Sequence, residues 1–397
     1  MRCVRKVTED LYWVGVNDKR LHLFENIHPI PRGVSYNSYL LMDEQTVLFD
    51  TVDWSGCREF LKNVEEVLDG RDLDYLIINH MEPDHAASME EVLIRYPNCK
   101  VISNEKSFMF MHQFGFNVEG RKDEVKEGDI RCFGKHTITF VAAPMVHWPE
   151  AMVSFDTTNG VLFSADAFGS FGSLDGKLFN DEVNFDRDWI DDARRYFTNI
   201  VGKYGAQVQA LLKKAATLDI NTICPLHGPI LKENLAYYIG KYNVWSSYEP
   251  EDKGILVAYA SIHGNTKKAA EILAEKIKAL GEEKVAIADL SREDMAECVE
   301  DAFRYDRMIL CAATYDGNAF VPMEDFLHHL QIKTYQNRTV GLLENGTWAP
   351  TAANAMRKYL ESMKNVTILD DVVTIKSTYK PENEVAMDKL AQAIVNA

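Results

Sequence analysis

The sequence predicts a two-domain α/β protein whose C-terminal domain is a doubly wound parallel sheet. The chain has 397 residues, a length typical of two or three domains. Short apolar runs with strand character alternate with amphipathic helical segments throughout. The pattern changes after the polar, turn-rich stretch SSYEPEDKG at 246–254. We therefore place the boundary at residue 250, with domains at 1–250 and 251–397.

The N-terminal half contains short strands broken by polar turns. The expected strands are 10–16, 37–42, 46–52, 75–80, 99–104, 136–143 and 160–163. Helical spacing of apolar residues predicts one helix over 58–68 and another over 191–218. The long loops between these segments contain most of the unusual residues, and loops at strand ends often carry function.

The C-terminal half alternates more regularly. Apolar, β-branched runs predict strands at 255–261, 284–290, 307–315, 338–345 and 365–377. Amphipathic segments predict helices at 265–281, 295–303, 323–331, 351–363 and 384–396. This alternation is typical of a parallel sheet covered by helices on both faces.

Charge and cysteine usage narrow the class of protein. The net charge is −17, from 60 acidic and 43 basic residues, which disfavours nucleic acid or an anionic membrane as the main partner. The seven cysteines are scattered and contain no C-x-x-C pair, so we expect free thiols rather than disulfides or a cysteine-ligated metal. With no apolar leader and no segment long enough to span a bilayer, we expect a soluble cytoplasmic protein.

The stretch NHMEPDHAAS at 79–88 is a candidate metal site. Two histidines and two carboxylates lie within six residues after a strand, and alternate residues His80, Glu82 and Asp84 can converge on one cavity. A charged surface loop is the alternative interpretation. Three further candidates, His147, Asp166 and His227, each follow a strand and are flanked by turn-forming residues. We expect six other histidines to be structural or surface residues: His22, His28, His112, His136, His328 and His329.

Three loops in the C-terminal half favour a ligand that carries a phosphate and a flat ring. The first, SIHGNT at 261–266, joins a strand to a helix and offers small residues and helix N–H groups suited to phosphate. The others, TYDGN at 314–318 and NGTWA at 345–349, end parallel strands, where such sheets bind ligands. Tyr315 and Trp348 could present aromatic faces to a flat heterocycle, although either residue taken alone is more often structural.

These loops resemble, in order, the phosphate loop and the two isoalloxazine loops of flavodoxins, with His263 where many members have threonine. The resemblance implies one noncovalent FMN. Its contacts would come from the three loops: Ser261, Ile262, His263, Gly264, Asn265, Thr266, Thr314, Tyr315, Asp316, Gly317, Asn318, Asn345, Gly346, Thr347, Trp348 and Ala349.

The N-terminal pattern resembles the metallo-β-lactamase superfamily, which implies an αββα sandwich with a binuclear site. Hydrolases of that superfamily usually carry H-x-H-x-D-H, whereas this chain has Glu82 at the second ligand position. The implied ligands are His80, Glu82 and His147 for one ion, Asp84, His227 and in some members His85 for the other, with Asp166 bridging. Three carboxylates favour iron over zinc, because anionic oxygens stabilise the ferric state.

The whole chain is similar to two-domain flavodiiron proteins. That resemblance implies reduction of O₂ to water, of NO to N₂O, or of both, at two non-haem irons that receive electrons through FMN. It also implies an external donor such as rubredoxin, or reduced F420 in some relatives, and a head-to-tail homodimer or dimer of dimers. If His85 is not a ligand, it is a candidate proton-handling group. Two alternatives stay open: a binuclear zinc hydrolase with an accessory flavodoxin domain, and a noncatalytic flavin electron carrier or gas sensor.

Overall fold

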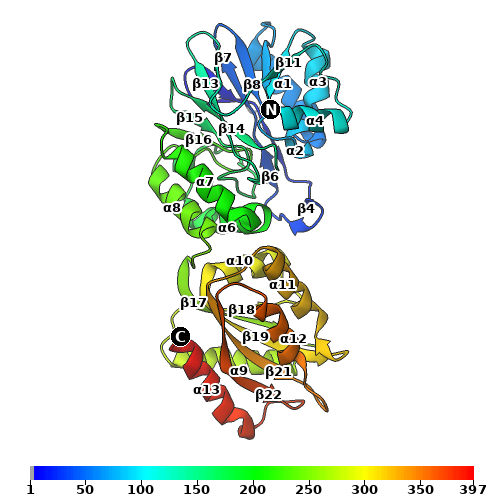
Figure 1. The fold of residues 1–397 in the computed structure, drawn as a ribbon, viewed down its shortest axis with the longest axis vertical. Coiled ribbons are helices and arrows are strands. Elements are labelled where there is room, and N and C mark those ends of the chain that lie inside the picture. The colour runs from blue at the N-terminus through cyan, green and yellow to red at the C-terminus, as the bar shows by residue number, and fades with distance from the viewer. Residues whose placement is uncertain (1–3) are drawn as a thin grey trace. The chain divides into compact units, whose positions relative to one another are not determined.

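The computed structural model describes residues 4–397, and the chain divides into two compact units, residues 1–243 and 244–397 (Figure 1). The division falls within helix α8 (Leu235–Ser246), a few residues before the expected boundary at 250. Of the seven cysteines that we expect to be free, Cys3 lies outside the described residues, and the other six form no disulfide. No helix in residues 4–397 is long and apolar enough to cross a membrane.

The N-terminal unit contains two main β-sheets. In spatial order, the first consists of β1 (Arg5–Lys6), β2 (Leu11–Trp13), β7 (Tyr39–Met42), β8 (Thr46–Phe49), β9 (Tyr75–Ile77), β10 (Lys100–Ser103) and β11 (Lys122–Glu124). The second consists of β12 (Ile130–Cys132), β13 (Thr137–Ala142), β14 (Met152–Asp156), β15 (Val161–Phe163) and β16 (Thr222–Cys224). Two small ribbons pair β3 (Val16–Asp18) with β6 (Val34–Tyr36) and β4 (Leu23–Phe24) with β5 (His28–Pro29).

The two sheets face each other across one hydrophobic core. Side chains of β2, β7, β8 and β9 pack there against side chains of β13, β14 and β15. At the centre, Phe49 and Phe163 stack with ring centroids 3.7 Å apart. Figure 1 shows α1 (Cys57–Leu68), α3 (Met89–Arg95) and α4 (Glu105–Gln113) beside the first sheet, and α6 (Ile190–Tyr196), α7 (Gly205–Ala215) and α8 beside the second. The expected αββα sandwich is therefore confirmed.

Helix α1 has the expected amphipathic pattern, because buried Phe60, Val64 and Leu68 recur every four residues. The single helix expected over 191–218 is wrong. After α6 the chain forms a π-helical turn, η3 (Phe197–Val201), and a 3₁₀ turn, η4 (Gly202–Tyr204), before α7 begins. Gly202 and Gly205 lie at these breaks, and glycine weakens a helix by adding backbone freedom. Four further short helices are η1 (Trp54–Gly56), α2 (Pro83–Ala86), η2 (Asn180–Glu182) and α5 (Phe185–Asp188).

The C-terminal unit is built on a parallel sheet. Its order is β18 (Val285–Asp289), β17 (Asp252–Ala260), β19 (Tyr305–Tyr315), β21 (Arg338–Asn345) and β22 (Val366–Ile375), with short β20 (Asn318–Ala319) paired to β19. All neighbours in the five-strand path are parallel, and the order 2-1-3-4-5 is doubly wound. The expected flavodoxin-like sheet is therefore confirmed.

Helices cover both faces of this sheet. One face packs against α9 (Asn265–Ala279) and α13 (Glu384–Val395), which follows η5 (Pro381–Asn383). The other packs against α10 (Met295–Arg304), α11 (Val321–Ile332) and α12 (Ala352–Glu361). Because β17, β19 and β21 are adjacent and parallel, the three loops that follow them lie along one edge of the sheet. In doubly wound folds, this carboxyl edge is where ligands bind.

Candidate metal centre

The seven candidate ligands come from four loops at the ends of strands in both sheets. His80 and Glu82 follow β9, and Pro83 then begins the short helix α2, which carries Asp84 and His85. Proline suits the first helical position because the missing N–H is not needed there. The remaining ligands follow strands of the second sheet: His147 after β13, Asp166 after β15 and His227 after β16. The structure brings all seven into two adjoining groups.

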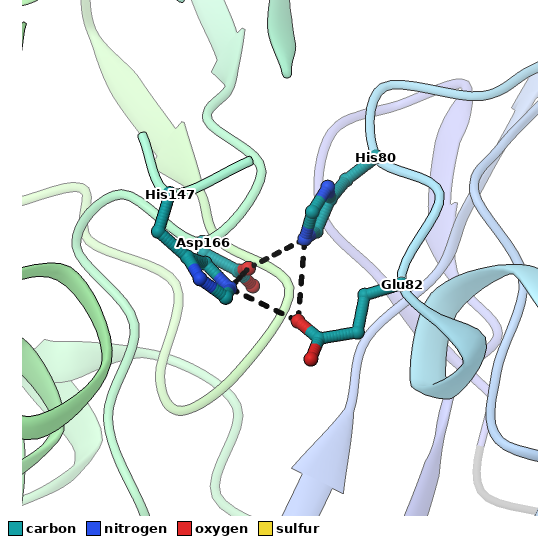
Figure 2. Close-up of side chains that lie close together, drawn as sticks. All are labelled: His80, Glu82, His147 and Asp166. Carbon is teal, nitrogen blue, oxygen red and sulfur yellow. Dashed lines mark hydrogen bonds and ion pairs between the residues drawn. The ribbon is translucent and has the colours of Figure 1, made fainter. Parts of the chain in front are cut away.

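The first group consists of His80, Glu82, His147 and Asp166 (Figure 2). Oε2 of Glu82 lies 3.3 Å from His80 Nε2 and 2.9 Å from His147 Nε2. Oδ2 of Asp166 lies 3.2 Å from each of the same two nitrogens. Two imidazole nitrogens and two carboxylate oxygens thus converge on one point.

The second group consists of Asp84, His85 and His227, and Asp166 adjoins it with its other oxygen. Oδ2 of Asp84 lies 3.2 Å from both His85 Nε2 and His227 Nε2. Oδ1 of Asp166 lies 3.3 Å from His85 Nε2 and 3.7 Å from His227 Nε2. Each oxygen of Asp166 therefore faces a different group, as a bridging carboxylate would.

The arrangement of the donor atoms suits coordination of metal ions better than it suits hydrogen bonds between the donors themselves. Both oxygens of Asp84 and of Asp166, together with Nε2 of His85 and His227, are buried and have no hydrogen-bond partner, although they lie within ion-pair distance. Two donors about 2.1 Å from one ion, at angles of about 90–110°, lie roughly 3.0–3.4 Å apart, close to the separations observed. The two groups can therefore hold two ions.

Electrostatics in the two groups agree with this interpretation. Burial alone would lower the pKa of His85 and His147, but neighbouring carboxylates outweigh it and raise the values to about 10 and about 9. Burial opposes ionisation of Asp166 too, yet His80 and the other imidazoles hold its pKa well below the usual range. The carboxylates therefore stay ionised and attract cations, which are protons until a metal displaces them.

Residues behind the ligands orient the rings. His227 donates its Nδ1–H to the backbone carbonyl of Ser35 at 2.7 Å, and His80 donates to Glu150 Oε1 at 2.8 Å. Both bonds leave Nε2 free for a metal. Sequence reasoning missed Glu150, although its position directly after HWP in the His147 loop was a usable signal. It also missed Glu25, which lies beside Glu82 and whose pKa burial and Glu82 raise to about 7.

The three C-terminal loops lie at the carboxyl edge of their sheet, and two of them are fixed by hydrogen bonds. In the first, Ser261 Oγ accepts the Gly264 N–H at 3.1 Å, and α9 begins at the next residue. The second is held to the segment after the third, because Thr314 Oγ1 accepts the Thr351 N–H at 3.0 Å. Trp348 is 90% exposed and Tyr315 43% exposed, an unusual state for large aromatic rings.

Comparisons with known proteins agree with the folds described for both units. A family model described as ODP family beta lactamase matches residues 34–228, and a flavodoxin domain model matches residues 256–386. The chain is 27% identical over 383 residues to the anaerobic nitric oxide reductase flavorubredoxin of Vibrio vulnificus, covering 95% of this chain and 76% of that protein.

Solved structures match over nearly the whole chain. Rubredoxin oxygen:oxidoreductase from Desulfovibrio gigas superposes with a TM-score of 0.93 at 25% identity, covering 99% of this chain and 98% of that one. The flavodiiron protein from Giardia intestinalis gives a TM-score of 0.90 at 22% identity with the same coverage.

Proposed function

The chain belongs to the flavodiiron protein family, and on that premise we propose that it reduces O₂ to water, NO to N₂O, or both. It is an oxidoreductase with a metallo-β-lactamase-like unit and a flavodoxin-like unit. The single observation that carries the proposal is Asp166, whose two oxygens face two groups of donors within one buried site. Such a site holds a pair of ions close enough for one small molecule to meet both.

The metals are two non-haem irons per chain. We assign His80, Glu82 and His147 to one ion, Asp84, His85 and His227 to the other, and Asp166 to both. Glu82, where zinc hydrolases of this superfamily carry histidine, raises the number of carboxylates to three and favours iron. His85 is a ligand in this proposal, because its Nε2 lies as close to the carboxylates of the second group as Nε2 of His227 does.

This chain's own residues hold the site and exclude water from it. When bound by these residues, two irons would supply Lewis-acid and redox chemistry to the site. Aromatic rings of Phe24, Tyr36 and Tyr196 surround His227, with centroids 5.3–5.9 Å from its imidazole. Trp148 packs edge-on against His80 at 5.4 Å. Such walls lower the local dielectric and strengthen charge interactions inside.

The flavodoxin-like unit is proposed to bind one FMN. The Ser261–Thr266 loop and the N-terminus of α9 would hold the phosphate. The loops Thr314–Asn318 and Asn345–Ala349 would flank the ring, with Tyr315 and Trp348 offering exposed aromatic faces. A bound flavin exchanges electrons one or two at a time, which suits both a two-electron and a four-electron reduction.

The electron donor and the assembly are also proposals. A small redox protein such as rubredoxin, or reduced F420, would reduce the flavin, and a head-to-tail homodimer or dimer of dimers would bring one chain's FMN to another's irons. The names of the D. gigas and V. vulnificus relatives support rubredoxin as the donor. A cytoplasmic location would match the absence of disulfides among the described cysteines.

The test is anaerobic purification, quantification of iron and FMN, and gas-electrode assays that compare NO with O₂ under a reducing donor. We expect two irons and one FMN per chain and sustained consumption of at least one gas. A His147→Ala variant should lose turnover, whereas His112→Ala, at an exposed histidine of α4, should keep it. Two bound zincs without gas consumption would instead support a hydrolase.

A further inference from the structure

Glu150 lies directly behind the first group of ligands. It is 2% exposed, and its Oε1 accepts two hydrogen bonds, from His80 Nδ1–H at 2.8 Å and from the Met81 N–H at 2.9 Å. Both partners donate through N–H, so Oε1 acts as the acceptor in both bonds. Because His80 points its other nitrogen at Glu82 and Asp166, Glu150 is coupled to the ion site through one imidazole ring.

The two groups contain the same kinds of charged ligands. Each contains two imidazoles and one carboxylate of its own, and they share Asp166. The two groups differ in the hydrogen-bond partners of the Nδ1 atoms of their ligand histidines. The partner of His80 is a carboxylate, the partner of His227 is the neutral carbonyl of Ser35, and Nδ1 of His85 has no hydrogen-bond partner. His80 is therefore hydrogen-bonded directly to a carboxylate, whereas Asp50, the buried carboxylate near the second group, interacts with His85 without a hydrogen bond to its ring.

The surroundings of Glu150 screen the charge of its carboxylate only weakly. Its Oε2 is buried without a hydrogen-bond partner, and the residue borders a cavity of about 370 Å³. Most of the cavity wall is apolar: Val125, Phe140, Val141, Ala142, Pro144, Pro149, Ala151 and Met152. Apart from Glu150, the charged residues on the wall are exposed and equal in number for each sign: Lys106, Lys126, Glu105 and Glu127. A charge in apolar surroundings acts over a longer range than one in water.

We infer that Glu150 is a positioning residue that makes the two irons inequivalent, so that the ion held by His80 is oxidised before its neighbour. Its hydrogen bond fixes the ring of His80 with Nε2 toward the ion, and its charge stabilises the ferric over the ferrous state there. In each step one iron loses one electron, which a soluble mediator carries to the electrode in a redox titration. The inference rests on the proposed function only for the identity of the metal.

Two variants separate positioning from charge. Glu150→Gln keeps an oxygen that can accept both N–H groups but removes the charge, whereas Glu150→Ala removes both. Glu105→Gln is the matched control, because it removes an exposed carboxylate from the wall of the same cavity. Circular dichroism of the apo proteins checks that each variant folds.

The readouts are the two one-electron midpoint potentials, followed by electron paramagnetic resonance during a mediated titration, and the affinity of the apo protein for Fe²⁺. We expect Glu150→Gln to raise the potential of the first oxidation and narrow the gap between the two steps, with near-normal affinity. Glu150→Ala should bind Fe²⁺ about 10–100-fold more weakly. Potentials in Glu150→Gln equal to those of wild type, or an equal shift in Glu105→Gln, would overturn the inference.

These readouts do not depend on turnover. If the chain binds two irons but reduces neither gas, the proposed function fails while the potentials still decide the role of Glu150. If the chain rejects iron, the same affinity comparison is made with Co²⁺, and equal affinities of wild type and Glu150→Ala would again overturn the inference.

Discussion

An Asp166→Asn variant should bind one metal ion per chain where the wild-type chain binds two. Asparagine has the shape of aspartate, but its Nδ2 has no lone pair to offer a metal. One oxygen remains for one ligand group, and the amide presents N–H groups to the imidazoles of the other. Asp166 lies 3.2 Å from both nitrogens of the first group and 3.3 and 3.7 Å from those of the second. We expect the oxygen to stay with the closer group.

The size of the effect follows from the number of donors. The second group keeps three donors and loses both an oxygen ligand and half a shared negative charge. Since losing a mere supporting hydrogen bond weakens metal binding about 10–100-fold, losing a direct ligand should weaken it by more than about 100-fold. The apo variant should be less stable than wild-type apo protein, because His80, His85 and His147 lose the buried carboxylate with which they pair.

The assay is anaerobic titration of apo protein with Fe²⁺, followed by gel filtration and metal analysis. Asp69→Asn is the matched control, because Asp69 is exposed and has a left-handed backbone conformation that asparagine also adopts. The reasoning is refuted if Asp166→Asn retains two ions with wild-type affinity.

Three further substitutions test the site and its scaffold. His136 is buried between Asp156 and Asp10, whose carboxylates outweigh burial and raise its pKa to about 9. Its contribution to stability is therefore complete below pH of about 6.5 and lost as pH rises through about 9. His136→Gln should lower the unfolding free energy by about 3–5 kcal/mol at pH 6 and by less at pH 9.5, measured by urea unfolding; a pH-independent difference would contradict this. Glu82→His should shift the bound metal from iron toward zinc when apo protein is loaded with both in equal amounts, and an unchanged ratio would count against the carboxylate argument. Phe163→Ala, which removes a ring stacked across the two sheets, should cost about 3–5 kcal/mol in the same unfolding assay, and a loss below 1 kcal/mol would show that the core closes around it.

The ligand residues could be predicted from sequence because each follows an apolar strand. His147, Asp166 and His227 lie far apart in the chain, but strands bring their ends to one edge, so position after a strand was informative. The assignment of the ligands to two groups was harder to predict from the residues alone. An extended loop would place Glu82 and Asp84 in one cavity, whereas the helical turn that begins at Pro83 directs them to different groups.

Contacts between residues far apart in the sequence could not be predicted. Glu150 reaches His80 across 70 residues, and the carbonyl of Ser35 reaches His227 across 192. The break after Tyr196 was also hidden, because its apolar spacing continues the helical pattern while the backbone changes to a π-helical turn. Hydrophobic periodicity records which face is buried and not how tightly the backbone winds.

The ligands of each ion also connect the two layers of the sandwich, which are otherwise joined by core packing and by a few hydrogen bonds, such as that from Ser154 Oγ to Asn79 Oδ1. His80, Glu82, Asp84 and His85 belong to the loop after the first sheet, and His147, Asp166 and His227 to loops after the second. Bound ions are therefore cross-links between the two layers of the sandwich, in addition to being a reaction centre. Ligands that bind only the folded state stabilise it by mass action. If the proposed irons are bound there, a shortage of iron would leave chains whose two layers separate more readily, so metal supply would set the lifetime of the folded chain as well as its proposed activity.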